Sequence, residues 1–391
     1  MMYSKIGIEG YRVLECERKH KGVLVHLEVK EKPRKCPCCG GLGLHSKGRY
    51  LRRAKHLECF GDDSELHVRC RRYQCLSCRK SFVQPLPGIL PYRRSTEPFR
   101  EEVYKRHEDG ICGSRLAEIK RIGAATVERI YHQFTERKAK ERISRECPEV
   151  LGIDEHTLHK GNRFATTFCD LKNHRVFDVV PGRCEADLKS FLNRLKGRKK
   201  VKVVCIDLSS PYRSMIRRYF PNARIVADRF HVIRIVQQHF IQLARQIDPK
   251  LKNHRGKLAC LRKTPSKLDN KQRLRRDLFF AEHPAIKALY EQMWKLIELM
   301  NVRTQSARAC RGHARRLMQY IDQLKDSRFD AMNTLAKTLS QWAEPIACMW
   351  RFYKNNGITE GFHRKMKLIQ RRAYGFRNFN NYRLRVIAQC G

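Results

Sequence analysis

The chain has 391 residues and a formal net charge of +44, from 83 Lys and Arg against 39 Asp and Glu. Basic residues recur in every segment, which predicts a polyanionic partner, nucleic acid above all, although ribosomes, polyphosphate and anionic membrane surfaces also attract such a chain. The sequence has neither a run of about 18 apolar residues nor an apolar N-terminal core, so we expect no membrane insertion or secretion and a cytoplasmic, nucleoid-associated protein.

The N-terminal region, residues 1–90, is expected to hold a β-hairpin and a zinc ribbon. Alternating apolar and polar residues in 11–16 and 22–29 predict the hairpin. Two CxxC knuckles follow, separated by a β-like stretch, and such paired turns offer four thiolates to one tetrahedral zinc ion. The expected ligands of one structural Zn²⁺ are Cys36, Cys39, Cys75 and Cys78, with Cys38 and Cys70 as spares.

The ribbon has two open interpretations. Its zinc can be purely structural, because so small a fold cannot bury enough apolar surface alone. A DNA-binding role would come from surface arginines, of which we expect Arg71 and Arg72 to contact DNA, although an arginine cluster can be merely solvated. A proline-rich connector, residues 84–91, ends this region.

Residues 91–147 are expected to form a helix-turn-helix DNA-binding domain. A short helix from Gly113, a turn at 121–125 and a second helix at 124–134 fit that layout, with Thr126 and Arg129 of the second helix as DNA contacts. The turn is less polar than is usual for the motif. An ordinary helical hairpin is the competing interpretation.

Residues 148–233 change to a pattern of strands and helices, which predicts an α/β sheet. The segments 150–154, 163–169 and 175–180 read as a three-stranded meander. A helix at 186–195 then leads to a buried strand that ends on Asp207, and a second helix at 213–219 leads to a strand that ends at Asp228. Carboxylates at strand ends indicate a site at the edge of this sheet.

The rest of the chain is predicted to be helical and basic. Residues 234–347 show no further strand, and residues 348–391 contain a helix with Glu360 and an aromatic-rich basic tail. In this tail aromatic rings alternate with arginines that we expect to bind DNA, namely Arg371, Arg372 and Arg377. Packing of a helix end on the core explains the aromatic residues about equally well.

Three acids stand in suggestive settings, namely Asp154, Asp207 and Glu360. A lone Asp after a strand is usually a turn or cap residue. If these three converge, however, their repulsion demands cations, and two Mg²⁺ or Mn²⁺ ions about 3.5–4 Å apart suit phosphoryl transfer. On the helix of Glu360, the expected supporting residues at i+3, i+4 and i+7 are His363, Arg364 and Lys367.

The motifs together resemble a known family. The two knuckles, the helix-turn-helix, GIDE at 152–155, IDLSSPY at 206–212, ADRFH at 227–231 and TEGFHRKMKLIQRRAYGFRNF at 359–379 are similar to bacterial insertion-sequence transposases of the ISL-three family. The resemblance implies a multidomain α/β protein with an RNase-H-like catalytic core, a helical insertion at 234–347 and a DDE triad. Carried onto this chain, the triad is Asp154, Asp207 and Glu360, with Asp228 and His231 as active-site support.

The expected function is that of a DNA transposase. It would bind the terminal inverted repeats of its element as a homodimer or higher oligomer, cleave double-stranded DNA and join the freed 3′-hydroxyl to target DNA. Two alternatives stay open. One is a zinc-ribbon and helix-turn-helix regulator with an inactive RNase-H-like domain, and the other is an RNase-H-like nuclease without strand transfer.

Overall fold

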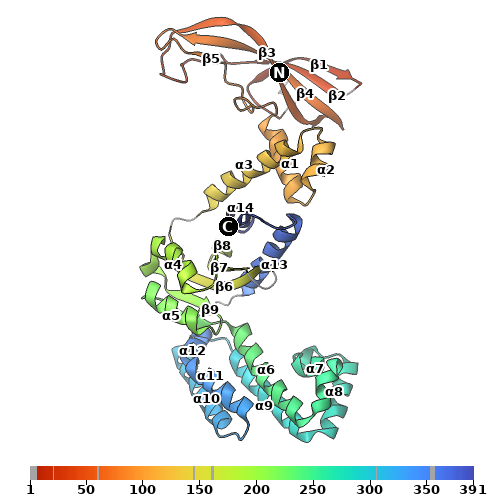
Figure 1. Cartoon of the computed structure of the whole chain (residues 1–391), viewed down its shortest axis with the longest axis vertical. Helices are drawn as coiled ribbons and strands as arrows, with labels where there is room; N and C mark the ends of the chain where they lie inside the picture. Colours follow the sequence, from red (N-terminus) through yellow and green to blue (C-terminus); the bar gives the residue numbers. More distant parts are fainter. Residues whose placement is uncertain are drawn as a thin grey trace. The chain divides into compact units, whose positions relative to one another are not determined.

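The computed structural model divides into two compact units, Met1–Arg137 and Lys138–Gly391. Both combine strands with helices, so the expected mixed α/β architecture is confirmed (Figure 1). The residues described by the structure are 7–20, 22–59, 61–143, 146–159, 163–304, 306–352 and 357–391.

The first unit opens with a five-stranded sheet in the order β1-β2-β4-β3, with β5 beside β4. Its strands are β1 Tyr11–Lys19, β2 Gly22–Val29, β3 Leu44–Cys59, β4 Asp62–Cys75 and β5 Ser81–Val83. The predicted hairpin is confirmed, since β1 and β2 pair antiparallel. Alternate residues of β2, including Val23, Val25 and Leu27, are buried, as expected for a strand with one face on a core.

Two helices, α1 Glu97–Glu108 and α2 Gly113–Ile119, and most of a third, α3 Ala124–Arg142, complete this unit, and α3 crosses the boundary at Arg137. The hydroxyl of Thr96 caps α1 by accepting from the Phe99 N–H at 3.3 Å. Lys120, between α2 and the turn, is 1% exposed and pairs with Glu58 of β3 at 2.6 Å and Glu102 of α1 at 2.9 Å. This buried cation therefore ties the helices to the sheet.

The second unit is built on a sheet in the order β10-β9-β6-β7-β8. Its strands are β6 Val150–His159, β7 Arg163–Asp170, β8 Arg175–Pro181, β9 Val203–Ile206 and β10 Arg224–Ala227. Antiparallel pairing of β6 with β7 and of β7 with β8 confirms the predicted meander, while β9 and β10 run parallel to β6. All four residues of β9 are buried, which explains its continuous apolar sequence.

Helices surround this sheet and extend beyond it (Figure 1). Two follow β8 and β9, namely α4 Glu185–Arg194 and α5 Ser210–Tyr219. The predicted helical segment is confirmed as α6 Arg229–Ile247, α7 Arg255–Arg262, α8 Asn270–Glu282, α9 Pro284–Asn301, α10 Ala307–Lys325, α11 Asp330–Gln341 and α12 Ala343–Arg351, with short 3₁₀ turns at Pro249–Asn253 and Pro265–Lys267. A third 3₁₀ turn, Arg198–Lys200, precedes β9.

The chain then returns to the sheet. α12 contacts β10, α13 Gly357–Arg372 contacts β6, and α14 Phe379–Cys390 contacts β8. Arg383 of α14 donates two hydrogen bonds, of 2.6 and 2.7 Å, to the buried carboxylate of Asp178 on β8, which fixes the last helix. Within the described ranges, helices long and apolar enough to cross a membrane do not occur.

Candidate functional site

Three acids lie along one edge of the sheet in the second unit, with Asp154 inside β6 just beyond its pairing with β9, and Asp207 and Asp228 directly after β9 and β10. Gly152 of β6 pairs with Cys205 of β9, so Asp154 and Asp207, two residues further on, stand at the same level. Asp228 follows β10, and its N–H donates to the carbonyl of Ile206 at 2.7 Å. The registers of β6 with β9 and of β9 with β10 therefore bring the three acids to one level of the sheet, a proximity that the sequence predicted for Asp154 and Asp207.

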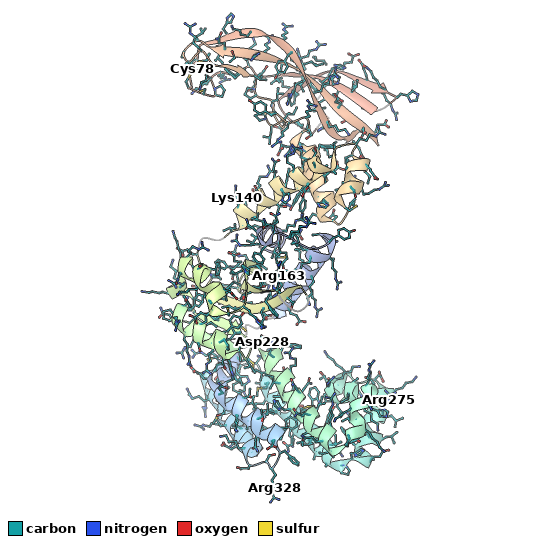
Figure 2. The ribbon with its side chains drawn as sticks, viewed as in Figure 1. Cys78, Lys140, Arg163, Asp228, Arg275 and Arg328 are labelled. Atoms are coloured by element: carbon teal, nitrogen blue, oxygen red, sulfur yellow. The ribbon has the colours of Figure 1, made fainter. Side chains whose placement is uncertain are left out.

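His231 connects two of these acids. Its Nδ1 lies 2.8 Å from Asp207 Oδ1 and 2.7 Å from Asp228 Oδ2, and the three side chains offer donor atoms within 4.8 Å of one another. Asp228 stands where β10 ends and α6 begins (Figure 2). The single Nδ1 proton hydrogen-bonds to Asp228, and among the described residues the buried Oδ1 of Asp207 accepts no hydrogen bond. An unsatisfied carboxylate oxygen of this kind fits a divalent cation.

The charges at this site perturb one another. Burial, followed by repulsion from Asp207, raises the pKa of Asp154 to about 7. Burial lowers the pKa of His231, but the close carboxylates of Asp207 and Asp228 outweigh burial and raise that pKa to about 9. The site therefore gathers more negative charge than its histidine compensates, which a cation would relieve.

The third predicted acid stands on the adjacent helix. Glu360 lies in the first turn of α13, with its side chain 52% exposed, and accepts a 3.0 Å hydrogen bond from Arg364. One turn further, His363 Nδ1 lies 3.6 Å from Asp154 Oδ2. We call the sheet edge that carries Asp154, Asp207 and Asp228 the acidic edge, and α13 borders it through His363. Among the described residues, the tight donor cluster comprises Asp207, Asp228 and His231 and does not include Glu360.

A buried polar network behind Asp154 was not foreseen from the sequence. Thr167 Oγ1 lies 3.0 Å from His156 Nδ1 and 3.1 Å from His363 Nε2, and His156 Nε2 lies 2.8 Å from the Tyr382 hydroxyl. Burial lowers the pKa of His156 to about 3 and that of His363 to about 4, so both rings are neutral at physiological pH. The period-two spacing of Asp154 and His156 on β6 was the available signal.

The four predicted zinc ligands converge in the first unit. Cys36, Cys39, Cys75 and Cys78 offer sulfurs within 4.8 Å of one another, and Cys78 is labelled in Figure 2. The Cys36–Cys78 and Cys39–Cys75 sulfurs are 3.8 and 3.6 Å apart. A zinc tetrahedron with bonds of about 2.3 Å has edges of about 3.8 Å, so the cluster fits this ion.

The environment of these thiols favours metal binding. Backbone N–H groups lower the pKa of Cys36, and the Cys78 N–H is the main cause that lowers the pKa of Cys75 to about 6. The spare cysteines are engaged elsewhere, since Cys38 accepts from Lys80 Nζ at 3.2 Å and Cys70 donates to the Tyr50 carbonyl at 3.5 Å. Four converging sulfurs with thiolate-stabilising turns are therefore suited to zinc.

The residues expected to contact DNA are distributed over both units. Arg71 lines a basic pocket of about 330 Å³ in the first unit, and Arg72 is exposed beside it on β4. Arg129 is exposed on α3, where its guanidinium donates to Thr126 Oγ1 at 3.0 Å. The three tail arginines, Arg371, Arg372 and Arg377, are also exposed.

Comparison with known proteins relates the chain to mobile DNA elements. A model of DDE transposases of the ISL3 type, described as a transposase, matches residues 151–386. The chain is also 27% identical over 407 residues to the transposase for insertion sequence element IS1001 from Bordetella parapertussis, an alignment that covers 99% of this chain and 97% of that protein.

Proposed function

The chain belongs to the ISL3 family of DDE transposases, and we propose that it binds the terminal inverted repeats of an insertion sequence and catalyses metal-dependent DNA cleavage and strand transfer. The observation that carries the proposal is the acidic edge, where Asp154 inside β6 lies level with Asp207 and Asp228 at the ends of β9 and β10, and where the buried Oδ1 of Asp207 accepts no hydrogen bond from the described residues. Such a site suits a reaction at phosphate through divalent ions.

The second unit is proposed to hold an RNase-H-like core. The order β8-β7-β6-β9-β10, an antiparallel meander followed by two parallel strands, supports this assignment. The helical segment between β10 and α13 corresponds to an insertion. The proposed domains are therefore the ribbon region 1–90, the helix-turn-helix domain 91–147, the core 148–233 and 348–391, and the insertion 234–347.

Within this core the proposed catalytic residues are Asp154, Asp207 and Glu360, with two Mg²⁺ or Mn²⁺ ions as cofactors. When bound, the ions would activate the attacking hydroxyl and stabilise the leaving oxygen. Asp154 would offer its oxygens from β6, Asp207 from the end of β9, and Glu360 from the first turn of α13. Asp228 is the alternative acid, because its carboxylate lies in the tight donor cluster.

The neighbouring residues are proposed to position this set. His231 bridges Asp207 and Asp228, and His363 packs beside Asp154. Arg364 holds Glu360 and, with Lys367 one turn further along α13, offers positive charge for DNA phosphates. These residues orient oxygens and substrate and take no covalent part.

DNA recognition is assigned to the first unit. A structural zinc ion would be held by Cys36, Cys39, Cys75 and Cys78, and α3 would read DNA as the second helix of a helix-turn-helix. Arg71, Arg72, Thr126 and Arg129 are the proposed contacts of this unit. Assembly as a homodimer or larger complex on two DNA ends, and a cytoplasmic, nucleoid-associated location, stay predictions.

An Asp207→Asn variant tests the proposal. We expect it to abolish metal-dependent cleavage of a duplex that carries the element's own end, while end binding changes less than about threefold, because the substitution keeps side-chain shape and removes only the charge. The matched control is Glu155→Gln, an exposed neighbour of Asp154 on the opposite face of β6, which should cleave like wild type. Loss of end binding in Asp207→Asn would instead assign this residue a structural role.

A further inference from the structure

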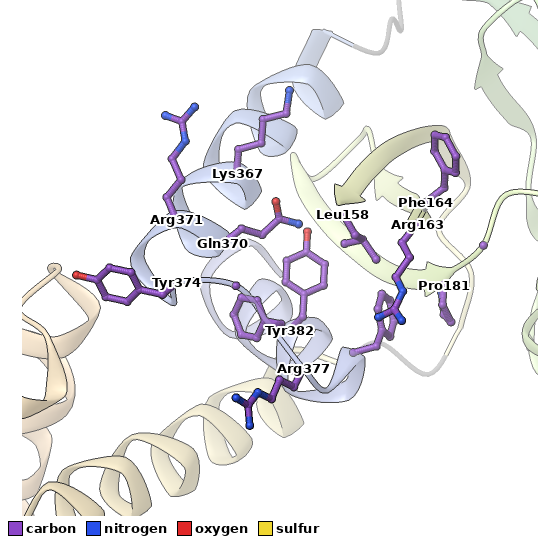
Figure 3. A pocket seen from close by; sticks show the side chains of 14 residues that line it. Leu158, Arg163, Phe164, Pro181, Lys367, Gln370, Arg371, Tyr374, Arg377 and Tyr382 are labelled. Carbon is purple, nitrogen blue, oxygen red and sulfur yellow. The ribbon is translucent and has the colours of Figure 1, made fainter. Parts of the chain in front are cut away.

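A pocket of about 600 Å³ adjoins the acidic edge in the second unit. Its walls come from the end of β6, the start of β7, the end of β8, the last turns of α13 and the segment that leads into α14 (Figure 3). None of the fourteen described residues that line it is acidic. Its volume lies within the range of sites that enclose small organic ligands.

The floor of the pocket is aromatic and fixed in place. Tyr382 is 1% exposed, its hydroxyl is hydrogen-bonded to His156 at 2.8 Å, and the amide of Gln370 points toward it (Figure 3). The rings of Phe376 and Phe379 pack on Tyr382 with centroid distances of 5.2 and 5.8 Å. Rigid rings of this kind offer a preformed surface for a flat apolar group.

The rim carries basic side chains that have no acidic partner among the described residues. Arg163, Lys367, Arg371 and Arg377 are all exposed, and none of them forms an ion pair with another described residue. Elsewhere in this unit exposed cations do pair with acids, as Lys200 does with Glu146. Four free cations around an aromatic floor match a ligand that combines a flat ring with phosphate.

The rim also holds an aromatic residue in an unusual conformation. Tyr374 is 92% exposed with φ of 51°, and Gly375 beside it has φ of 97°. Left-handed backbone at a tyrosine costs roughly 1 kcal/mol of free energy. Because the Tyr374 ring is exposed, its packing does not offset this cost. Figure 3 shows this ring turned outward, where it is free to stack on a further base.

The pocket is continuous with the acidic edge along two elements. Asp154, His156 and Leu158 alternate along one face of β6, so Leu158 in the pocket wall lies ~13 Å from Asp154 along the strand. On α13, His363 beside Asp154 is followed one turn later by Lys367 at the rim. This span corresponds to a few nucleotides at about 3.4 Å each along one strand of DNA.

We propose that the pocket receives one nucleobase extruded from the DNA duplex a few nucleotides from the cleaved bond, with the flanking phosphates held by Arg163, Lys367, Arg371 and Arg377. The inference rests on the proposed function, since it names a subsite for the same substrate. Extrusion is required because a base that stays stacked inside a duplex cannot reach the aromatic floor of a pocket. The bound base would fix the register of the DNA relative to the acids.

Photocrosslinking of the wild-type full-length protein tests this directly. A duplex with the element's end carries one 5-iododeoxyuridine, placed in turn at each nucleotide near the cleaved bond, and Ca²⁺ replaces Mg²⁺ so that binding proceeds without turnover. We expect one position to crosslink strongly, to a peptide that contains Phe376, Phe379 or Tyr382. Crosslinks spread evenly over many positions, or directed to other peptides, would overturn the proposal.

A pocket-filling variant provides the second measurement. Leu158→Trp places an indole in the cavity and should lower both that crosslink and DNA cleavage at least about tenfold, whereas the same change at Leu278, an exposed leucine of α8 outside the pocket, should behave like wild type. Undiminished cleavage and crosslinking by Leu158→Trp would contradict the proposal. If wild type crosslinks at one position yet never cleaves with Mg²⁺ or Mn²⁺, the proposed function fails and the pocket stands. If wild type cleaves DNA but forms no crosslink in the pocket, the proposed function stands and the base-binding pocket is refuted.

Discussion

Asp154 lowers the free energy of unfolding because the fold buries its carboxyl group beside another acid. Its carboxyl is buried beside Asp207, and its pKa is raised to about 7. The unfolded chain ionises this group near pH 4, so folding must retain a proton, or accept a buried charge, above that pH. Carboxyl groups with a strongly raised pKa cluster at functional sites.

The Asp154→Asn variant should therefore be more stable than wild type in EDTA. Because the pKa is higher in the folded state, the acid destabilises the fold progressively from about pH 4 to pH 7, and we expect the variant to gain about 2 to 4 kcal/mol at pH 8. The gain should disappear toward pH 4. Thermal or urea unfolding across this range measures it, with Glu155→Gln as the matched control. A variant less stable than wild type at pH 8 would show that the carboxyl of Asp154 supports the fold.

The polar network shows what single residues do together at this site. His363 contacts Asp154, and the ring is held from behind by Thr167, which also contacts His156. Neutral histidines between buried hydroxyls fix side-chain positions without adding charge. The side chain of Asp154 is consequently oriented by elements that are distant in sequence.

At the scale of elements, the two knuckles bring four sulfurs together. One knuckle lies before β3, and the other begins at the end of β4. Without a metal, four thiols this close cannot all ionise. The Lys80 N–H favours the thiolate of Cys78, but desolvation and the three neighbouring sulfurs outweigh it and raise the pKa of Cys78 to about 12. A zinc ion removes this conflict by coordinating all four thiolates.

Cys39→Ser and Cys38→Ser provide a matched pair in one knuckle. Cys39 lies in the cluster and Cys38 outside it, bonded to Lys80. We expect wild type and Cys38→Ser to bind one zinc ion per chain, and Cys39→Ser to lose zinc and unfold the ribbon at lower temperature, since metal binding is coupled to folding in such modules. Metal analysis with thermal unfolding measures both. Equal zinc content in the two variants would refute the assigned ligands.

The elements that the sequence predicted are those with local causes. The meander β6-β7-β8 and the hairpin β1-β2 join strands that are adjacent in sequence, and each knuckle is a single turn. The parallel pairing of β2 with β4 was not predicted. Both strands alternate apolar and polar residues, and this local pattern does not determine which strand pairs with which. Tyr382 could not be linked to His156 either, since the hydrogen bond spans 226 residues.

The acids were predicted as residues, and their arrangement came from the fold. Strand ends indicated Asp207 and Asp228, an apolar run indicated Asp154 and the start of a predicted helix indicated Glu360. The resemblance of the motifs then implied a triad of Asp154, Asp207 and Glu360. Only the register of β9 with β10 puts Asp228 level with Asp207, and only the tertiary contact of α13 with β6 brings His363 to Asp154. Register and helix docking depend on packing between distant segments, which a single sequence does not state.

For the whole molecule, the charge of +44 should dominate non-specific DNA binding. If six or more phosphates are neutralised, affinity for a random duplex should fall about 10³-fold or more between 50 and 200 mM salt. Fluorescence anisotropy across this range measures the slope. If these side chains contact phosphate, Arg71→Ala and Arg72→Ala should each reduce the slope of log affinity against log salt concentration by about one. A nearly flat salt dependence would mean that the excess charge is solvated rather than used for DNA.

A cleavage and strand-transfer assay tests most directly whether the acidic edge performs transposition chemistry. The assay uses a duplex with the element's own ends and Mg²⁺ or Mn²⁺, and compares wild type with Asp154→Asn, Asp207→Asn, Glu360→Gln and Asp228→Asn. We predict that wild type nicks and joins DNA, that the first three variants lose both steps by at least about 10³-fold, and that Asp228→Asn retains more activity than these. Specific end binding without cleavage by wild type in either metal would contradict the account and favour a DNA-binding regulator, and cleavage without joined products would favour a nuclease.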